Sequence, residues 1–585
     1  MLKGLNSRMR RVLSAPFWAA TLCVTVPFLC VTLASDRLDA QSHVFPVRYE
    51  SGVVVSESSL ASTVGLTILQ RGGNAIDAAV ATAFALAVVH PRAGNIGGGG
   101  FLVVRLSDGR TATFDFRERA PLAATERMFL DEDGQYDRAR HHWGATSVGT
   151  PGSVAGLALA HERWGRRPWR ELVAPAVKLA RDGFSVTAPL ATSLREVATD
   201  LRKYPASWSQ FTKEGTFYEV GDRLAQPSLG RTLARIRDRG VAGFYEGETA
   251  DLLVAEMKRR NGLITHADLK SYEAVERPAV TGNYRGYEII GMGPPSSGGI
   301  AVVEMLHLLE RFPLRRWGSR SARATHVIVE AMRRAFADRA RYIGDPDYVE
   351  VPLDRLTSKE HAQARAQSIG LERASVSSPS RFTWPPESSE TTHLSVVDRD
   401  HMAVALTTTL ERSYGCRIVV PGAGFLLNNE MGDFNPERGQ TTVRGQIGTE
   451  PNLVAPQKRM VSSMSPTIVA RDGQLRLVVG SPGGRTIINS VLLTILRVVD
   501  FGMPVQEAID APRFHHQWLP DRIRVERWCF STDTRQFLER MGHTVELNPT
   551  SQGSVMAVSV VEVDGQPLLE AGVDRRRGGG GAAGY

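Results

Sequence analysis

The sequence predicts a layered α/β sandwich, and three patterns support this prediction. Short strand-like segments occupy Val53–Ser56, Phe101–Arg105 and Thr111–Phe116. Helix-length apolar segments lie between and after them, and strand patterns dominate after residue 390. Pairs of strands flanked by long buried helices are typical of layered α/β folds. With 585 residues, 42% of them hydrophobic, the chain can build a large core.

The helices are indicated by spacing and by their ends. Leu60–Gln70 carries apolar residues at helical spacing and stops at two glycines. Ala75–Val89 is apolar nearly all round, which predicts a buried helix, and Asn74 is placed to cap it. Further helical patterns cover residues 168–181 and 301–342. After residue 390 we expect one clear helix, near residues 487–499.

A hairpin is predicted for Leu394–Asp398 and Met402–Thr409. If residues 399–401 form a three-residue loop, Thr391 pairs with Thr409, whereas a two-residue loop pairs it with Thr408. Paired Cβ atoms lie about 4.5–5.5 Å apart, so either register places a second hydroxyl beside Thr391. The alternative is that these threonines are simply good strand formers.

Thr391 stands where a Ser- and Pro-rich segment, residues 375–390, meets this hairpin. A hydroxyl in that position becomes an N-terminal nucleophile if the Glu390–Thr391 bond is cut, because the new α-amine can serve as its base. The cut needs no protease. Thr391 Oγ can attack the Glu390 carbonyl, shift the acyl group from nitrogen to oxygen, and leave an ester for water to hydrolyse.

The segment from Thr391 to Asp398 is similar to the start of the small subunit of γ-glutamyltranspeptidases. Other segments match this family in order and spacing, from about residue 45 to the end: Gly94–Phe101, Asp115–Glu118, Leu427–Met431, Ser462–Thr467, Gly480–Gly484 and Ala511–Trp518. The resemblance implies a four-layer αββα sandwich of the N-terminal nucleophile hydrolase type. It also implies a self-processed heterodimer, with residues 41–390 as the large subunit and 391–585 as the small one.

The resemblance assigns the catalytic roles. It makes Thr391 the processing residue and nucleophile and Thr409 its supporting hydroxyl. It places the oxyanion hole at the amides of Gly483 and Gly484, where glycine lets backbone N–H groups approach closely.

The resemblance also assigns the substrate contacts. Arg117 would bind the α-carboxylate of a γ-glutamyl group, with Ser462 and Ser463 as further donors. Glu430 and Asp433 would hold its α-ammonium. No cofactor or metal is implied.

Two positions depart from many relatives. Glu411 stands where many have Asn and some bacterial ones have Glu, and we expect a third carboxylate to make the ammonium pocket more acidic. Arg444 lies in the lid segment, residues 435–451, where some bacterial relatives place a Tyr gate.

The N-terminus reads as a signal peptide, residues 1–40. Four basic residues precede an uncharged stretch at 17–34, and Leu38-Asp39-Ala40 is a plausible cleavage site. We therefore expect an exported protein, periplasmic or secreted; an uncleaved membrane anchor is the alternative. Of the four cysteines, only Cys416 and Cys529 lie beyond the leader, and one bridge between them is possible in an oxidising compartment.

Other functions find little support. The net charge of +8 is concentrated near the two ends, without the basic, aromatic-interleaved stripe of nucleic-acid binders. Gly97–Gly100 lacks dinucleotide-loop spacing and predicts a tight packing turn. His515 and His516 are adjacent, with no ligand cluster after them, which favours a structural role.

The expected function is that of an exported γ-glutamyltranspeptidase and glutathione hydrolase. It would pass the γ-glutamyl group from Thr391 to water or to an amino acid or peptide acceptor. One alternative is a glutaryl-type β-lactam (cephalosporin) acylase of the same family; a remote one is a non-enzymatic exported binding protein with a degenerate site.

Overall fold

Two antiparallel seven-stranded sheets form the centre of the structure, a computed structural model that describes residues 47–378, 391–439, 448–548 and 550–585. The first sheet has the order β21 (Gly581–Gly584), β2 (Val53–Ser56), β12 (Thr391–Val397), β13 (Ala403–Thr409), β3 (Gly99–Arg105), β4 (Thr111–Phe116) and β9 (Val275–Arg277). The second has the order β1 (Arg48–Tyr49), β20 (Gln566–Val573), β19 (Met556–Val563), β15 (Gln474–Gly480), β14 (Thr467–Arg471), β11 (Tyr287–Gly291) and β10 (Val280–Tyr284).

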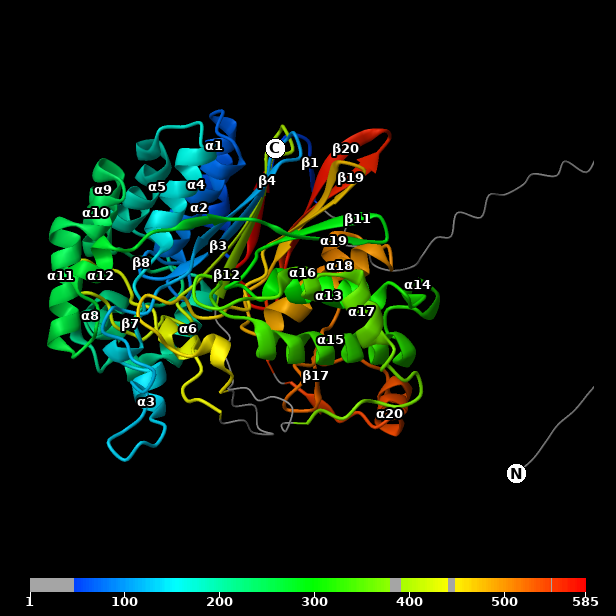
Figure 1. Ribbon diagram of the computed structural model, residues 1–585. Helices are drawn as coiled ribbons and strands as arrows, with labels where there is room; N and C mark the ends of the chain where they lie inside the picture. Colours follow the sequence, from blue (N-terminus) through cyan, green and yellow to red (C-terminus); the bar gives the residue numbers. More distant parts are fainter. Residues whose placement is uncertain (1–46, 379–390, 440–447, 549) are drawn as a thin grey trace, which may run out of the picture. The chain divides into compact units, whose positions relative to one another are not determined.

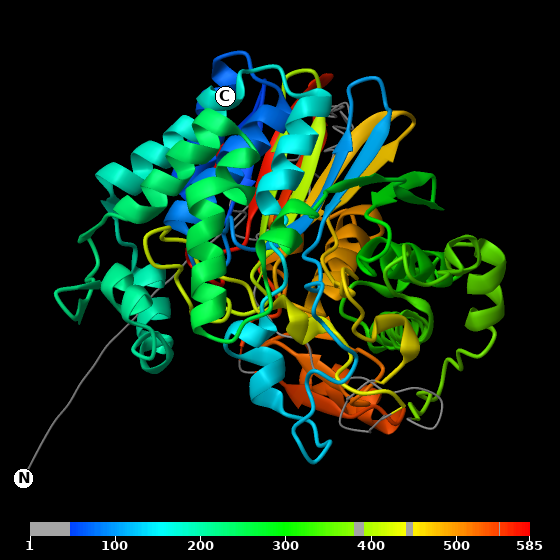
Figure 2. The same ribbon diagram turned by 60° about the vertical axis from the view of Figure 1, so that its left-hand side comes forward.

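Helices cover the outer face of each sheet, as Figures 1 and 2 show. The first sheet is covered by α1 (Ser59–Gln70), α2 (Ala75–Val89), α4 (Ser153–Trp164), α5 (Trp169–Asp182) and α9 (Pro227–Arg239). The second is covered by α13 (Gly298–Leu309), α15 (Ala322–Tyr342), α17 (Lys359–Ala366), α18 (Thr486–Val499) and α19 (Val505–Asp510). The layers are therefore helix, sheet, sheet, helix, and the predicted four-layer αββα sandwich is confirmed.

Smaller elements connect these layers. The helical ones are α3 (Arg138–His142), α6 (Ala188–Glu196), α7 (Ala198–Leu201), α8 (Pro205–Phe211), α10 (Ala242–Tyr245), α11 (Gly247–Arg259), α12 (His266–Lys270), α14 (Leu314–Trp317), α16 (Leu353–Leu356) and α20 (Thr532–Arg540). The short strands are β5 (Phe184–Ser185), β6 (Thr212–Lys213), β7 (Thr216–Phe217), β8 (Arg223–Leu224), β16 (Phe514–His515), β17 (Ile523–Val525) and β18 (Val545–Leu547).

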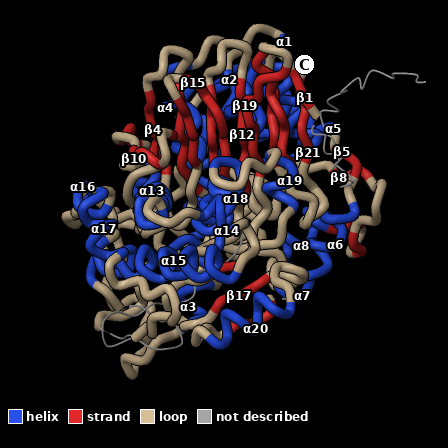
Figure 3. The backbone as a smooth tube through the Cα atoms, turned by 90° about the vertical axis from the view of Figure 1, so that its right-hand side faces the viewer, coloured by secondary structure: helices blue, strands red, loops and turns tan. Residues whose placement is uncertain are grey.

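The central strands are buried on both faces because they lie between two cores. Along β2, Val54 packs into the core beneath α1 and α2, whereas Val53 and Val55 belong to the core shared by the two sheets. Side chains alternate between the faces of a strand, so this segment must be apolar at every position. Figure 3 shows the strands lying side by side above the helices of the second sheet.

Most predicted elements are confirmed, with small shifts at their ends. Asn74 caps α2 as expected: its side chain accepts a hydrogen bond from the amide of Asp77 at 3.0 Å, and the Asp77 carboxylate accepts one from the amide of Asn74 at 3.0 Å. The helical stretch at 301–342 is interrupted, forming α13, α14 and α15. The expectation of a single clear helix after residue 390 is wrong, because α19 and α20 follow α18. The first has only six residues, and the second buries Leu538 alone.

The glycines at 97–100 pack tightly: Gly97 and Gly98 lie in a bend of the chain, as expected, and Gly99 and Gly100 begin β3. A Cβ at Gly98 would lie 2.1 Å from the carbonyl oxygen of Thr409, and one at Gly100 would lie 2.3 Å from that of Thr407. Only glycine fits so close to the β13 backbone.

The two body cysteines are separate buried thiols, so the possible bridge between Cys416 and Cys529 does not form. His515 and His516 are buried and hydrogen-bonded within the fold, to Gln517 and Asp521 among others. No helix in the described parts of the chain combines the length and apolarity needed to cross a bilayer. The leader at residues 1–40, Glu390 and Arg444 lie outside the described residues.

Candidate active site

The hairpin places Thr391 at the head of a central strand. β12 and β13 pair so that Thr391 faces Thr409, and the Asp398 amide bonds the Met402 carbonyl at 3.1 Å. The loop is therefore the three-residue one, and of the two predicted registers the structure has the one that pairs Thr391 with Thr409. The Asp398 side chain fixes this turn by accepting from the amide of Ala75, the first residue of α2, at 2.9 Å. Thr391 itself is only 5% exposed.

The Thr409 end of the hairpin is held by hydrogen bonds from two directions. Thr409 Oγ accepts from the Glu411 amide at 2.8 Å, which sets the path of the chain as it leaves β13. Asn95 Nδ2, from the glycine-rich segment before β3, donates to the Thr409 carbonyl at 2.9 Å. The second hydroxyl therefore belongs to a rigid frame.

The two predicted oxyanion glycines lie in the loop between β15 and α18. Gly483 has φ +135° and Gly484 has φ +56°, backbone angles that residues other than glycine rarely adopt. A Cβ on Gly483 would also lie 2.6 Å from Thr486 Oγ. Helix α18 begins at Thr486, so the partial positive charge of its N-terminus lies next to this loop.

A small cavity of about 20 Å³ brings most of the predicted residues together. Its lining comprises Arg117, Thr391, Thr409, Glu411, Glu430, Asp433, Ser462, Ser463, Met464, Gly484 and Ile487. Of the site residues predicted from sequence, Gly483 adjoins the lining without belonging to it, and Glu390 is not among the described residues. Segments more than 300 residues apart in the chain thus meet at Thr391.

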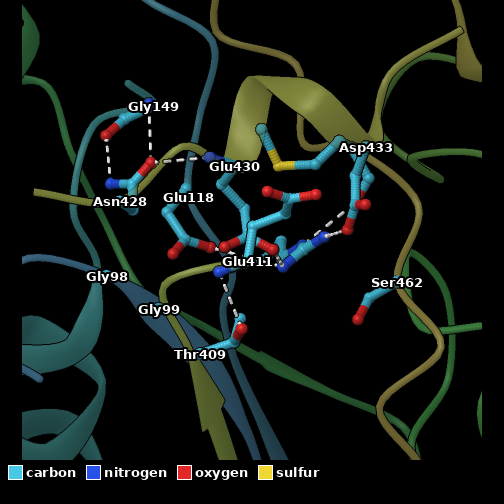
Figure 4. A network of polar contacts seen from close by, with 12 residues as sticks. Gly98, Gly99, Glu118, Gly149, Thr409, Glu411, Asn428, Glu430, Asp433 and Ser462 are labelled. Atoms are coloured by element: carbon cyan, nitrogen blue, oxygen red, sulfur yellow. Dashed lines mark hydrogen bonds and ion pairs between the residues drawn. The ribbon is translucent and has the colours of Figure 1, made fainter. Parts of the chain in front are cut away.

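Arg117 is the centre of a buried ionic network, whose carboxylates Figure 4 shows converging. Its guanidinium is fully buried; it donates to Glu430, and to Asp433 Oδ2 at 2.5 Å. It also bonds the carbonyls of Met460 and Val461, both at 3.3 Å. Burial alone would lower the pKa of Arg117, but the carboxylates outweigh it and raise that pKa, so the guanidinium stays charged.

The acidic residues around Arg117 outnumber it. Burial raises the pKa of Glu118 to about 7 and that of Glu411 to about 8, and it raises the pKa of Glu430 well above its usual value. Desolvation disfavours the charged forms of these carboxyls, and their mutual repulsion adds to it. Burial therefore disfavours the charged form of Glu411, and a cation bound in the pocket would favour its ionisation.

The two serines line the opposite wall. Ser463 Oγ accepts from Arg339 Nη2 at 3.0 Å, and Arg339 Nε donates to Ser297 Oγ at 2.7 Å. Ser297 in turn donates to the Ser462 carbonyl at 2.6 Å. The serine segment is thus fixed from behind by α15, which carries Arg339.

Sequence reasoning missed three supporting residues. Arg339 lies within a long helical pattern, and nothing in that pattern distinguishes a buried arginine. Asn429 donates to Glu411 and accepts from the Arg412 amide at 3.2 Å. Glu118 lies 3.6 Å from Arg117, and neither carboxylate oxygen has a hydrogen-bond partner in the described structure. Asn429 and Glu118 both fall inside recognised motifs, so closer attention to those motifs could have found them.

The fold and the position of the hydroxyl define a class of protein. An αββα sandwich with a threonine at the head of a central strand is the architecture of N-terminal nucleophile hydrolases. Residues 61–584 match the family model described as gamma-glutamyltranspeptidase, and the chain belongs to that family.

Relatives agree with this membership. The chain is 47% identical to a glutathione hydrolase proenzyme from Escherichia coli over 519 residues, 88% of this chain and 89% of the relative. It is 35% identical to an acylase ACY 1 proenzyme from a Pseudomonas species, over 88% of this chain and 90% of that one.

Similar solved structures also include both an acylase and a gamma-glutamyltranspeptidase. The cephalosporin acylase from Bacillus halodurans superposes with a TM-score of 0.81 at 26% identity, covering 95% of this chain and 99% of its own. The Helicobacter pylori gamma-glutamyltranspeptidase gives a TM-score of 0.54 at 44% identity, covering 54% of this chain and 91% of its own.

Proposed function

We propose that this chain is an exported γ-glutamyltransferase and glutathione hydrolase that cuts itself between Glu390 and Thr391. Residues 41–390 would then form the large subunit and residues 391–585 the small one. The precursor would lose residues 1–40 on export to the periplasm or beyond. The single observation that carries the substrate assignment is the contact of Arg117 with Glu430 and Asp433 in the cavity that Thr391 lines.

This contact complements an α-amino acid head group. Such a group carries a carboxylate and an ammonium two bonds apart, and here a guanidinium is in direct contact with two carboxylates. The substrate carboxylate can bind Arg117 while its ammonium binds Glu430 or Asp433, so every buried charge keeps an opposite partner. A γ-glutamyl group bound in this way extends its γ-carbonyl away from the charges, in the direction of the nucleophile.

Self-cleavage comes first. Thr391 Oγ attacks the Glu390 carbonyl carbon, the C–N bond breaks, and the Thr391 nitrogen takes a proton to become a free amine. Water then hydrolyses the ester, giving a carboxylate on Glu390 and a free hydroxyl on Thr391. Thr409 lies opposite Thr391 in the hairpin and can orient this hydroxyl.

The mature reaction repeats this chemistry on the substrate. The Thr391 α-amine accepts the proton of Oγ as Oγ attacks the γ-carbonyl carbon. The amides at Gly483 and Gly484, beside the N-terminus of α18, are suited to stabilise the oxyanion. The leaving amine departs with a proton, and water or an acceptor amine then takes the γ-glutamyl group from Thr391.

A glutaryl-type acylase is the nearest competing function, and the acylase relatives give it weight. A glutaryl group has the carboxylate but lacks the ammonium. It would occupy Arg117 and leave Glu430 and Asp433 buried without a cation, which is costly. The site therefore favours γ-glutamyl donors.

Processing can be tested with a matched pair of variants. Thr391→Ala should leave a single uncleaved chain without activity, because both steps need Oγ. Thr392→Ala makes the same change one residue along β12, where Oγ is buried without a hydrogen-bond partner in the described structure, and it should still yield two chains. N-terminal sequencing of the wild-type small chain should begin at Thr391. Two chains from Thr391→Ala would refute self-processing.

Substrate choice needs a separate assay. Wild-type enzyme should release the chromophore from a γ-glutamyl anilide far faster than from the matching glutaryl anilide. Equal rates, or a preference for glutaryl, would support the acylase function instead. A processed protein that turns over neither substrate would support a binding role.

A further inference from the structure

A second cluster of polar side chains lies in the helical layer that covers the second sheet. None of its residues lines the catalytic cavity. Glu304 of α13, Asp338 of α15 and His361 of α17 offer one donor atom each, and these atoms lie within 4.8 Å of one another. Glu304 is 1% and Asp338 6% exposed, so both carboxylates are held away from water. Three separate helices therefore converge on one point through these side chains.

The distances suit a tetrahedral metal ion. His361 Nε2 lies 3.0 Å from Asp338 Oδ2 and 3.9 Å from Glu304 Oε1. Zinc binds nitrogen and oxygen ligands at about 2.0–2.2 Å, which separates neighbouring ligand atoms in a tetrahedron by about 3.4 Å. The observed separations lie on either side of that value, so shifts of about half an ångström would complete the geometry.

Glu304 lacks a partner for one of its oxygens. Its Oε1 is buried and has no hydrogen bond to any described residue, although it faces the imidazole of His361. A buried carboxylate in this state needs a proton or a cation.

The neighbouring arginine is compatible with a metal ligand. Arg365 Nη2 donates to Asp338 Oδ1 at 3.0 Å, leaving Oδ2 facing the cluster. Metal-binding carboxylates are commonly oriented by a hydrogen bond on their other oxygen. Arg365 can neutralise one carboxylate, and the second still lacks a cation.

A similar-looking cluster, His326, Glu330 and His543, lacks this character. His326 bonds His543 at 2.8 Å and the Gly370 carbonyl at 2.6 Å, so both of its ring nitrogens are engaged. Glu330 accepts from Arg334 at 2.6 Å and from the Ser375 amide at 3.1 Å. The possible ligand atoms of this cluster therefore already have hydrogen-bond partners. The cluster holds the segment after Gly370 against α15.

We propose that Glu304, Asp338 and His361 form a binding site for a divalent transition-metal ion of the zinc type, with water as the fourth ligand. The imidazole and the small number of ligands favour such an ion over Mg²⁺ or Ca²⁺, which prefer six or more oxygens. The metal would join α13, α15 and α17. Because α15 also carries Arg339, the site would stabilise the layer behind the serine wall without taking part in catalysis.

The test is direct metal binding to the processed, full-length protein after chelator treatment. Wild-type protein should take up one Zn²⁺ per heterodimer of large and small subunits in equilibrium dialysis, and its Tm should rise saturably with Zn²⁺. Co²⁺ in the same site should give the intense visible absorption of tetrahedral cobalt. Glu304→Gln and His361→Gln should lose all three signals, while donor hydrolysis at permissive temperature should stay within about twofold of wild type.

Glu310→Gln provides the matched control. It removes the same charge immediately after α13, where Glu310 pairs with Lys359 at 2.7 Å, and it should bind zinc like wild type. Absence of saturable uptake by wild-type protein would overturn the proposal without reference to any variant. Uptake that survives both Glu304→Gln and His361→Gln would place the ion elsewhere and would overturn it equally.

Discussion

The two halves of the active site are built in different ways. Thr391 and Thr409 face each other through the register of one hairpin, a contact between residues 18 positions apart. Arg117, Glu430 and Asp433 meet only because the end of β4 and the 3₁₀ helix Glu430–Asp433, far apart in the chain, fold against each other. The hairpin depends on local backbone pairing, whereas the charged pocket depends on the whole sandwich.

This difference has an energetic consequence. A hairpin frame of backbone hydrogen bonds tolerates the loss of a single side chain. A buried ionic network does not, because removing one partner leaves the others desolvated and uncompensated. The nucleophile and the pocket should therefore respond separately to substitution.

The largest expected effect comes from Arg117→Met. Losing two charge-assisted hydrogen bonds to the donor carboxylate should lower kcat/KM by about 10²–10⁴-fold, at about 1.5–3 kcal/mol per bond. Self-cleavage should change less than about tenfold, because the hairpin stays intact. Steady-state kinetics and the rate of chain cleavage separate the two effects. Arg119→Met, two residues along, is the control; equal losses of cleavage and turnover in Arg117→Met would mean that the two halves are not independent.

Glu411→Gln should change how stability depends on pH. The pKa of Glu411 is raised to about 8 in the folded protein from an ordinary value of 4.5. The unfolded chain therefore releases this proton first, and wild type loses stability as pH rises from about 4.5 to about 8. The variant lacks that loss, so it should gain a few kcal/mol relative to wild type across this window. Thermal unfolding at pH 5 and pH 8 measures the gain; a constant difference would mean that Glu411 is ionised throughout.

Thr409→Val should slow self-cleavage by about 10- to 100-fold. It removes the hydroxyl opposite Thr391 and the acceptor for the Glu411 amide, while its shape and the strand pairing remain. The time course of precursor disappearance gives the rate. Thr407→Val, on the same face of β13 but opposite His393, should cleave nearly normally. If both variants slow alike, strand stability is the cause and the Thr409 hydroxyl has no special part.

The smallest effect is expected for Ser463→Ala. It removes the acceptor for Arg339 Nη2 at 3.0 Å, while the bond from Arg339 Nε to Ser297 remains. KM for a γ-glutamyl donor should rise by about 2- to 10-fold while kcat is unchanged, if the serine wall binds substrate as proposed and takes no part in bond cleavage, since one hydrogen bond contributes about 0.5–1.5 kcal/mol. A fall in kcat at constant KM would assign Ser463 to the chemical step.

Periodicity predicted the large elements well, because their patterns are strong. The apolar run at Ala75–Val89 and the capping Asn74 marked α2 correctly at both ends. Short helices such as α19 were not predicted, because six residues are too few to show a helical periodicity that distinguishes them from a loop. Gly98 was predicted to pack tightly, but only the structure shows that it packs against the Thr409 carbonyl.

By itself, the sequence determined the hairpin and the position of Thr391 at its head, because strand pattern and turn residues are local properties, and it narrowed the register to two choices. The structure selects the one that pairs Thr391 with Thr409. Its motifs also named the residues of the pocket. Only the tertiary structure decided that Arg117 is paired with Glu430 and Asp433, that Arg339 holds Ser463, and that burial raises the pKa of Glu411. Charges acquire their partners and their pKa values from desolvation and from distances between remote segments, and neither is written in the order of the residues.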